Sequence, residues 1–569
     1  MTFTYTVRPE DWAGIAPLVV LVITALVVML VDIALPHAGE KSKHTGPANF
    51  AVLPILSFLG ILGAIATTIA LLLVGHAAQV FNHMVGADAG TLYAYLVILG
   101  AGGLGILLSP AYLKRLNLVH QGEYYALWLF SMTGMMLMAA ATNFLIVFVG
   151  LEMLSLALYI LCSFVAGRKS SQESGMKYFL LSSFASAFLL YGIALVYAAT
   201  GSTTFSTTAQ SLKSVTHAPA LLLIALGLLS VGFAFKVSAV PFQSWTPDVY
   251  QGAPAPVTAF MSVGTKVAAF LAFVRVFGFV FLGVREDWYP VIWTLAVLTM
   301  VGGNIMALGQ SNIKRMLAYS SIAHGGYLLI GVVIGGGLGT SAILFYLGCY
   351  LFMNLGAFGV VSLLEHQDNS GSDSADLRGL WYRRPLLAGL LAFFLLALAG
   401  FPPMAGFAGK YYIFYAALRG GHPELLIIGV LTSVLGIYYY LRFAATMFME
   451  QRETAPAVGT VPTVPATPRV PATPGRVPAK AGAAAASTRR SATGTFSRGG
   501  AAVAVRPVPA QVAKTPVPAA ETIEQPATGG LSTLAWISLG LAALGTLVMG
   551  IVLLFDLSAL QQAAQMLLR

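Results

Sequence analysis

Residues 231–256 read Val-Gly-Phe-Ala-Phe-Lys-Val-Ser-Ala-Val-Pro-Phe-Gln-Ser-Trp-Thr-Pro-Asp-Val-Tyr-Gln-Gly-Ala-Pro-Ala-Pro. An apolar run with one lysine, Lys236, meets a series of prolines here. Because proline removes a backbone donor and clashes with the preceding turn, the pattern predicts a helix that breaks at or near Pro241. Carbonyls freed by a break at membrane depth need a protein interior or a wet cavity, and a lysine at that depth costs about 2.5–3.5 kcal/mol to insert. We therefore interpret the stretch as a site that handles ions or protons.

The composition indicates an integral membrane protein. Of the 569 residues, 57% are hydrophobic and only 9% are charged, whereas a soluble domain carries about 25% charged residues. Apolar runs of about 20 residues can cross a bilayer as helices, and the first run is too long for a signal peptide. We therefore predict an all-α polytopic protein with about fourteen transmembrane helices. The runs lie near 13–35, 50–75, 92–110, 122–140, 143–166, 177–200, 219–240, 255–282, 290–309, 317–334, 341–364, 385–418, 425–449 and 531–555.

The distribution of basic residues predicts the orientation. With the N-terminus outside, the cytoplasmic segments before residue 451 hold eleven lysines and arginines and the outer segments hold five. Basic residues concentrate on the cytoplasmic side, so both termini are expected on the outer, periplasmic side of a bacterial inner membrane. We interpret basic pairs such as Lys314-Arg315 as orientation signals and not as catalytic groups.

Two ionisable residues lie deep in predicted spans. Glu152 is the only acidic residue that we place there, and it needs a cation or a proton because an unpartnered carboxylate is too costly at that depth; a helix–helix hydrogen bond is the structural alternative. Lys266 lies near mid-bilayer, since a helix rises about 1.5 Å per residue, and its side chain cannot easily reach water. Arg275, nine residues further on, is expected to reach the outer interface.

Two further groups admit both a structural and a functional interpretation. Lys177 opens its run in half-polar surroundings, so it can extend to the cytoplasmic surface along its alkyl chain. His324 lies among small residues, where it is either a satisfied core group or a proton relay, because imidazole titrates near neutral pH.

A second proline break occurs at 399–412, which read Ala-Gly-Phe-Pro-Pro-Met-Ala-Gly-Phe-Ala-Gly-Lys-Tyr-Tyr. Pro402 and Pro403 interrupt this helix, and Lys410 follows the break. The interrupted helices are numbers seven and twelve, and such a correspondence indicates an internal repeat with sites at the repeat interface. Because they are five spans apart, an odd number, the two halves would be inverted. The predicted organisation is helices 1–3 at 1–121, a first repeat of helices 4–8 at 122–282, a second repeat of helices 9–13 at 283–450, and helix 14 at 531–569.

The segment 451–530 has a different composition, rich in Pro, Ala, Thr and Val and without apolar periodicity. This composition predicts a disordered cytoplasmic linker. The two cysteines form no CxxC cluster, so cysteine cannot supply an iron–sulfur or zinc site. The match Gly100-x-Gly102-x-x-Gly105 lies inside the third run with no strand before it, which favours close helix packing over dinucleotide binding.

The buried groups Glu152, Lys236, Lys266, His324 and Lys410 form a possible proton-relay line along the membrane plane. Burial disfavours the charged form of a lysine, and a nearby carboxylate favours it. A lysine whose carboxylate partner approaches or withdraws would therefore take up or release a proton. Glu152 with Lys236 is the candidate pair. No redox cofactor site is visible, so the driving energy must come from elsewhere.

The segment 235–260 resembles the subunit N family of the proton-pumping NADH–quinone oxidoreductase, respiratory complex I. Similar segments follow the same order: Leu-Glu-Met-Leu-Ser-Leu around Glu152, then 312–327 and 400–410. The resemblance covers about residues 10–450 and the last span. The sister antiporter-like subunits L and M usually show a Glu-Gly-Pro-Thr-Pro-Val form after the first break, which differs from Tyr-Gln-Gly-Ala-Pro-Ala-Pro-Val here.

The resemblance implies a fourteen-helix antiporter-like fold with two inverted five-helix repeats. It implies that Glu152 and Lys236 are the coupled pair, that Lys266 is the central connecting lysine and that Lys410 serves the second half-channel. Lys177 matches a lysine that modulates the pair. NADH, FMN, iron–sulfur clusters and quinone would be bound by partner subunits, and this chain would bind no cofactor, metal or nucleic acid.

The implied partners are the antiporter-like subunits L and M, the small membrane subunits and membrane lipids, with the quinone pool as an indirect partner. The long linker and Gln243, which stands where many relatives have a histidine, depart from the family pattern. Two other functions are open at this point: a subunit of a multi-subunit sodium/proton antiporter, which shares the fold, and a purely structural membrane scaffold.

Overall fold

The computed structural model describes residues 8–35, 49–74, 79–116, 118, 121–215, 217–366, 370–450, 531–552 and 557–568. The predicted linker at 451–530 lies outside the described residues. In this part of the chain the secondary structure is helical apart from a short antiparallel pair, β1 (Gln79–Val80) with β2 (Val85–Gly86), and isolated bridges.

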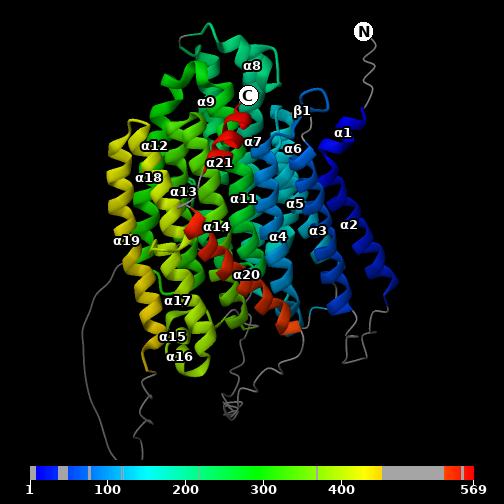
Figure 1. Cartoon of the computed structure of the whole chain (residues 1–569), viewed down its shortest axis with the longest axis vertical. Coiled ribbons are helices and arrows are strands. Elements are labelled where there is room, and N and C mark those ends of the chain that lie inside the picture. Colours follow the sequence, from blue (N-terminus) through cyan, green and yellow to red (C-terminus); the bar gives the residue numbers. More distant parts are fainter. Residues whose placement is uncertain are drawn as a thin grey trace, which may run out of the picture. The chain divides into compact units, whose positions relative to one another are not determined.

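The helices follow one another along the chain and run side by side (Figure 1). The first part contains α1 (Pro9–Gly14), α2 (Ala16–Ala34), α3 (Asn49–Val74), α4 (Ala89–Arg115), α5 (Gly122–Ala139), α6 (Phe144–Cys162), α7 (Lys169–Thr200), α8 (Phe205–Leu212), α9 (Ala220–Lys236), α10 (Trp245–Gly252) and α11 (Ala255–Arg275). The second part contains η1 (Val276–Val280), η2 (Leu282–Val284), α12 (Arg285–Leu308), α13 (Ile313–Ile334), α14 (Gly336–Leu364), α15 (Ser374–Leu377), α16 (Leu380–Arg383), α17 (Pro385–Ala399), α18 (Ala405–Arg419), α19 (Pro423–Phe448), α20 (Leu531–Val552) and α21 (Ser558–Leu567).

Eleven helices of the described residues are long and apolar enough to cross a membrane, and α9 and α17 are shorter apolar helices. The prediction of an all-helical polytopic membrane protein is therefore confirmed. Each of the fourteen predicted runs contains a helix. The run 219–240 holds α9, with α10 beginning beyond it, and the run 385–418 is divided between α17 and α18. The count of fourteen spans and the inversion of the two repeats stay predictions.

Both predicted helix breaks are present. The helix α9 ends at Lys236, before Pro241, and α10 begins at Trp245. The side chain of Trp245 donates from Nε1 to the Phe235 carbonyl at 3.1 Å, so a carbonyl at the interrupted end is satisfied within the protein, as a break at membrane depth requires. The second break separates α17 from α18, and Gly400 there has φ +96°, a conformation that favours glycine.

The helix α13 lies between the two breaks. It packs against α10, which follows the first break, and against α18, which follows the second, and it also contacts α11 and α14. In the most apolar 18-residue stretch of α13 and of α14, 89% of the residues are buried. In the corresponding stretch at α11 every residue is buried. A polar group on α13 is therefore shielded from lipid and lies within reach of both halves.

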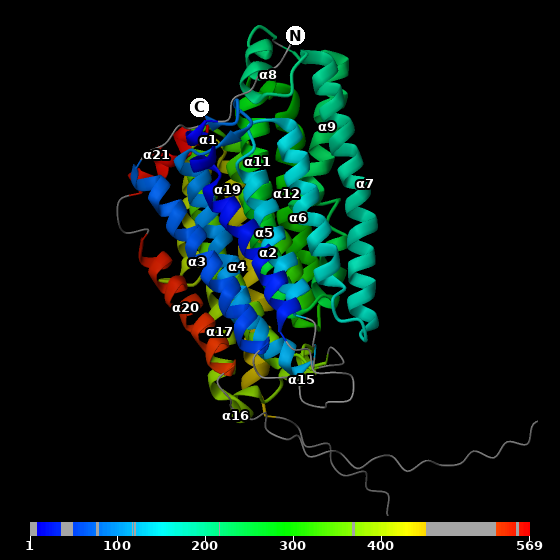
Figure 2. The same ribbon diagram turned by 90° about the vertical axis from the view of Figure 1, so that its right-hand side faces the viewer.

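The C-terminal helices cover one side of this core. The helix α20 runs obliquely across α4 and α14, and α21 packs against the same two helices (Figures 1 and 2). Large apolar side chains such as Ile33, Phe184 and Leu431 are exposed on α2, α7 and α19. Lipid tails are as apolar as leucine, so such faces fit a membrane.

Candidate proton-transfer site

Lys236 is the last residue of α9, and its side chain is enclosed by α6 and α7. Its Nζ donates to Ser155 Oγ at 2.7 Å and, at 3.4 Å each, to Tyr178 OH and Ser182 Oγ. The ammonium also lies 5.3 Å from the centre of the Tyr178 ring, a cation–π contact that offsets part of its desolvation. Only 2% of the residue is exposed, so the predicted burial of this lysine is confirmed.

Glu152 lies one helical turn before Ser155 on α6, and residues three apart on a helix share a face. Its carboxylate interacts electrostatically with Lys236. However, the described residues contain no ion pair within 4.0 Å between the Glu152 carboxylate and the Lys236 amine. Lys236 instead donates a hydrogen bond to the hydroxyl of Ser155. The Oε1 atom of Glu152 is buried and has no hydrogen-bond partner among these residues. The predicted pair therefore shares one site without direct contact.

Lys177 points to a different partner. It forms ion pairs with Glu173 at 2.7 Å and with Asp248 on α10 at 2.8 Å, and 41% of its side chain is exposed. Asp248 also pairs with Arg315 of α13 at 2.7 Å. Lys177 therefore meets the segment after the first break, and its contacts do not include Glu152 or Lys236.

Lys266 on α11 is buried and reaches α13. Its Nζ donates to the carbonyl of Ser321 and lies 5.8 Å from the centre of the Tyr350 ring. Tyr350 OH in turn donates to Ser321 Oγ at 2.9 Å. A Cβ added at Gly325 would lie 3.1 Å from the Val237 carbonyl and 3.6 Å from Lys266 Nζ. The first break and Lys266 therefore face the same small space on α13.

His324 occupies the centre of α13 and has hydroxyl partners on both ring nitrogens. Nδ1 lies 2.6 Å from Tyr346 OH, and Nε2 lies 3.2 Å from Tyr440 OH. Tyr440 OH is also hydrogen-bonded to Ser320 Oγ. These contacts suit both earlier interpretations, because a satisfied core histidine and a relay each need such partners.

Lys410 donates hydrogen bonds to backbone carbonyls at the C-terminal end of α17. Its Nζ donates to the carbonyls of Leu398 and Ala399 at 3.1 and 2.9 Å and to Ser433 Oγ at 2.9 Å. The last carbonyls of a helix have no partner within it, so this lysine replaces the hydrogen bonds that the second break removes. It also lies 5.6 Å from the centre of the Tyr327 ring on α13.

The helix α13 joins these groups. Ser321, His324 and Tyr327 are three residues apart and lie on successive turns of one face. Ser321 contacts Lys266 and Tyr327 contacts Lys410. A single buried helix therefore contacts one lysine from each half, Lys266 through the Ser321 backbone carbonyl and Lys410 through the Tyr327 ring. The line of groups along the membrane plane stays a prediction.

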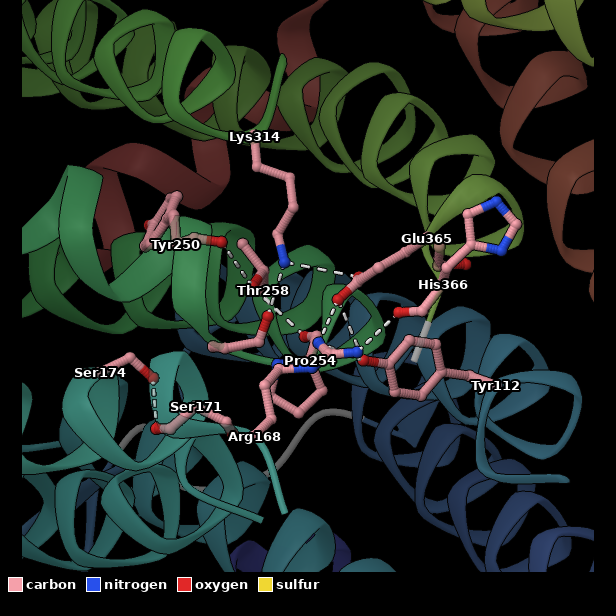
Figure 3. Close-up of polar contacts among 12 residues, drawn as sticks. Tyr112, Arg168, Ser171, Ser174, Tyr250, Pro254, Thr258, Lys314, Glu365 and His366 are labelled. Atoms are coloured by element: carbon pink, nitrogen blue, oxygen red, sulfur yellow. Dashed lines mark hydrogen bonds and ion pairs between the residues drawn. The ribbon is translucent and has the colours of Figure 1, made fainter. Parts of the chain in front are cut away.

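A cluster of charged side chains that is not apparent from the sequence lies where α13 begins (Figure 3). Glu365 directly follows the predicted run 341–364, and its buried carboxylate pairs with Arg168 and with Lys314. The interpretation of Lys314 as an orientation signal alone is incomplete, because its side chain is fully buried. The available signal was an acidic residue directly at the edge of an apolar run.

Arg275 is buried within the protein: it pairs with Asp88 and donates from Nη1 to the Ala139 and Ala141 carbonyls at 2.9 and 3.1 Å. Its place at the outer interface stays a prediction. Gln243 lies in the first break, and its Oε1 is buried without a hydrogen-bond partner in the described part of the chain. Within that part, no group of three or more His, Cys, Asp and Glu side chains could hold a metal ion.

Residues 141–436 match the family described as NADH:quinone oxidoreductase/Mrp antiporter, TM. The chain is 44% identical over 440 residues to NADH-quinone oxidoreductase subunit N of Trichlorobacter lovleyi, covering 77% of this chain and 88% of the relative. It is 42% identical over 455 residues to subunit N of Chloroflexus aggregans, covering 79% and 91%.

Among solved structures, a chain of respiratory complex I from Thermus thermophilus with bound aureothin superimposes with a TM-score of 0.63 and 34% identity, over 77% of this chain and 91% of that chain. A chain of the Mrp complex from Dietzia sp. superimposes with a TM-score of 0.64 at 22% identity, over 77% and 80%. The second likeness is one of fold.

Proposed function

Because the chain belongs to the subunit N family of NADH–quinone oxidoreductases, we propose that it is a proton-translocating subunit of the membrane arm of such a complex. It moves protons along Lys236, Lys266, His324 and Lys410, coupled to quinone reduction in partner subunits. In this proposal NADH, FMN, iron–sulfur clusters and quinone are bound elsewhere in the complex, and the chain itself carries no cofactor.

The support for α13 as the centre of the path is that it meets a buried lysine from each half. A charged group inside a membrane is costly and is retained where it marks an ion or proton path. Lys266 and Lys410 are both buried and both contact α13, with His324 between their contact points. A purely structural role does not account for the amines of Lys236 and Lys266, because an apolar side chain would pack at either position at lower cost. Lys410 differs in that its amine also satisfies the carbonyls at the end of α17.

The proposal assigns Glu152 to the control of Lys236. The carboxylate is near enough to act on the amine electrostatically, and Ser155 contacts the amine directly. In this scheme the Lys236 amine exchanges its contact with the Ser155 hydroxyl for an ion pair with Glu152. In this scheme Lys177 acts on the site indirectly, through its ion pair with Asp248 on α10.

We place the end of the bundle that holds Lys314 on the cytoplasmic side and both termini on the outer side of a bacterial inner membrane. The support is the excess of basic residues, eleven against five, in the segments at that end, since such residues concentrate in cytoplasmic loops. The partners are other membrane subunits of the complex, including the antiporter-like subunits L and M.

The test replaces Lys236 by methionine, which keeps length but removes the amine. NADH-driven quinone reduction and proton uptake are then measured on inverted membrane vesicles that contain the assembled complex. We expect both rates to fall by at least about tenfold, which corresponds to about 1.4 kcal/mol in the barrier. Lys114→Ala, at an exposed lysine, is the control. Wild-type rates in the Lys236→Met complex would contradict the proposal.

A further inference from the structure

The four side chains shown at the start of α13 form a closed buried unit, which we call the Lys314 cluster: Tyr112 of α4, Arg168 before α7, Lys314 of α13 and Glu365 after α14 (Figure 3). The side chains of Lys314 and Glu365 are fully buried, and that of Arg168 is 4% exposed. The cluster thus joins elements from both predicted repeats, and its charged groups are buried inside the bundle.

Each oxygen of the Glu365 carboxylate has its own partners. Oε1 accepts from Arg168 Nη1 and, at 3.2 Å, from Tyr112 OH. Oε2 accepts from Lys314 Nζ at 3.4 Å. Arg168 is fixed further by donating from Nη2 to the His366 carbonyl at 2.8 Å. The shorter and better supported ion pair is therefore the one between Arg168 and Glu365.

Lys314 has a second acceptor in the segment that follows the first break. Its Nζ donates to the Ala253 carbonyl at 2.8 Å, directly after the last residue of α10. An amine that has lost its extra proton still has two N–H donors and can keep both contacts. The position of Lys314 therefore does not depend on its charge.

The charges in the cluster do not balance when Lys314 is protonated. Arginine stays protonated in proteins, so Arg168 alone neutralises Glu365. Lys314 then adds one uncompensated positive charge in a buried site, and releasing a proton leaves the cluster neutral. The titratable and charged groups that act on Lys314 are Glu365, Arg168 and Cys162. Tyr112 and Arg115 contact Glu365.

The helix α13 connects Lys314 to the central lysine. Ser321 lies seven residues after Lys314, which is two turns and about 10 Å along the same face. The carbonyl of Ser321 is the acceptor of Lys266. Lys314 therefore lies along the helix from Lys266, toward the end of the bundle where α13 begins.

We propose that Lys314 is a further proton-carrying residue, which receives protons at this end of the bundle and supplies Lys266. In the step, one N–H bond of the Lys314 ammonium breaks, its proton moves through water along α13, and an N–H bond forms on the neutral amine of Lys266. Lys314 is then reprotonated from the adjacent aqueous side. This inference rests on the proposed function and adds the entry side of the path.

Two substitutions test it in the assembled complex. Lys314→Arg keeps the positive charge and the donors but cannot release a proton, and Lys314→Met leaves the balanced Arg168–Glu365 pair in place. We expect both complexes to assemble and both to lose at least about tenfold in NADH-driven proton uptake on vesicles, or about 1.4 kcal/mol. Lys236→Met and Lys114→Ala are measured beside them.

Near wild-type proton uptake in Lys314→Arg with strong loss in Lys236→Met would overturn the role of Lys314 and leave the proposed function standing. Near wild-type uptake in both would overturn the proposed function as well. Failure of Lys314→Met to assemble would also count against the inference, because a neutral Arg168–Glu365 pair predicts a stable cluster without the lysine.

Discussion

The two helix breaks use their lysines in different ways. Lys236 is the last residue before the first break, and its partners are the hydroxyl groups of Ser155, Tyr178 and Ser182. Lys410 lies in the helix after the second break, and two of its three acceptors are backbone carbonyls. Hydroxyls both donate and accept, whereas carbonyls only accept. The first lysine is therefore surrounded by groups that can pass a proton, and the second also holds the broken helix together.

This difference predicts the largest combined effect at the second break. Lys410→Met would leave the Leu398 and Ala399 carbonyls buried without a donor, at a cost of about 1–3 kcal/mol for each group. We expect a lower midpoint of thermal unfolding and a loss of quinone reduction in the purified complex. Lys236→Met is the matched comparison and should lose activity with a much smaller change in the midpoint. Equal midpoints for the two variants would remove the distinction between the breaks.

The space between the first break and Lys266 gives the second prediction. Gly325→Ala would place a Cβ 3.1 Å from the Val237 carbonyl, so the backbone beside Lys236 would have to shift. We expect a several-fold decrease in quinone reduction, since a distortion of about 1 kcal/mol changes a rate about fivefold. Gly227→Ala is the control, because nothing lies within 4 Å of the added atom there. Unchanged activity in Gly325→Ala would show that proton transfer does not depend on the space between the Val237 carbonyl, Lys266 and α13.

Glu152→Gln is expected to have an intermediate effect. The substitution removes the negative charge that acts on Lys236 and keeps a polar group of the same size. Breaking a direct buried ion pair costs about 3–5 kcal/mol, but Glu152 and Lys236 are not in direct contact. We expect a few-fold loss of activity and an unchanged unfolding midpoint, measured on the purified complex. A loss of stability as large as that of a buried ion pair would show that the two groups are paired in the working protein.

The smallest effect is expected at Lys177. Its ion pairs with Glu173 and Asp248 are partly exposed to solvent, and exposed pairs contribute about 0–1 kcal/mol. Lys177→Ala should reduce quinone reduction by less than the Glu152 substitution does. Asp248→Asn is the matching test, because it releases Lys177 and Arg315 together. A larger loss in Lys177→Ala than in Glu152→Gln would place Lys177 in the proton path itself.

The sequence allowed the helical runs, both breaks and the buried lysines to be predicted, because prolines and charges inside apolar runs are local signals. Lys236 and Lys410 stand out in this way without any knowledge of their neighbours. Partners on other helices are not local signals. Ser155 as the contact of Lys236, Asp88 as the partner of Arg275, and the Lys314 cluster all join residues far apart in the chain.

The position of Lys314 shows why such a prediction fails. A basic pair at the end of an apolar run is normally an orientation signal, and Arg315 does lie partly exposed beside Asp248. Lys314, the residue before it, points inward, where its amine contacts the Ala253 carbonyl and the Glu365 carboxylate. Only the packing of α13 against the end of α14 distinguishes the two adjacent side chains.

In the proposed function the amine of Lys236 carries a proton during turnover. The most direct measurement is NADH-driven proton uptake by vesicles that contain the assembled Lys236→Arg complex, since arginine keeps the charge and the donors but does not deprotonate. We expect assembly at the wild-type level and loss of nearly all proton uptake. Wild-type proton uptake with arginine at this position would contradict it.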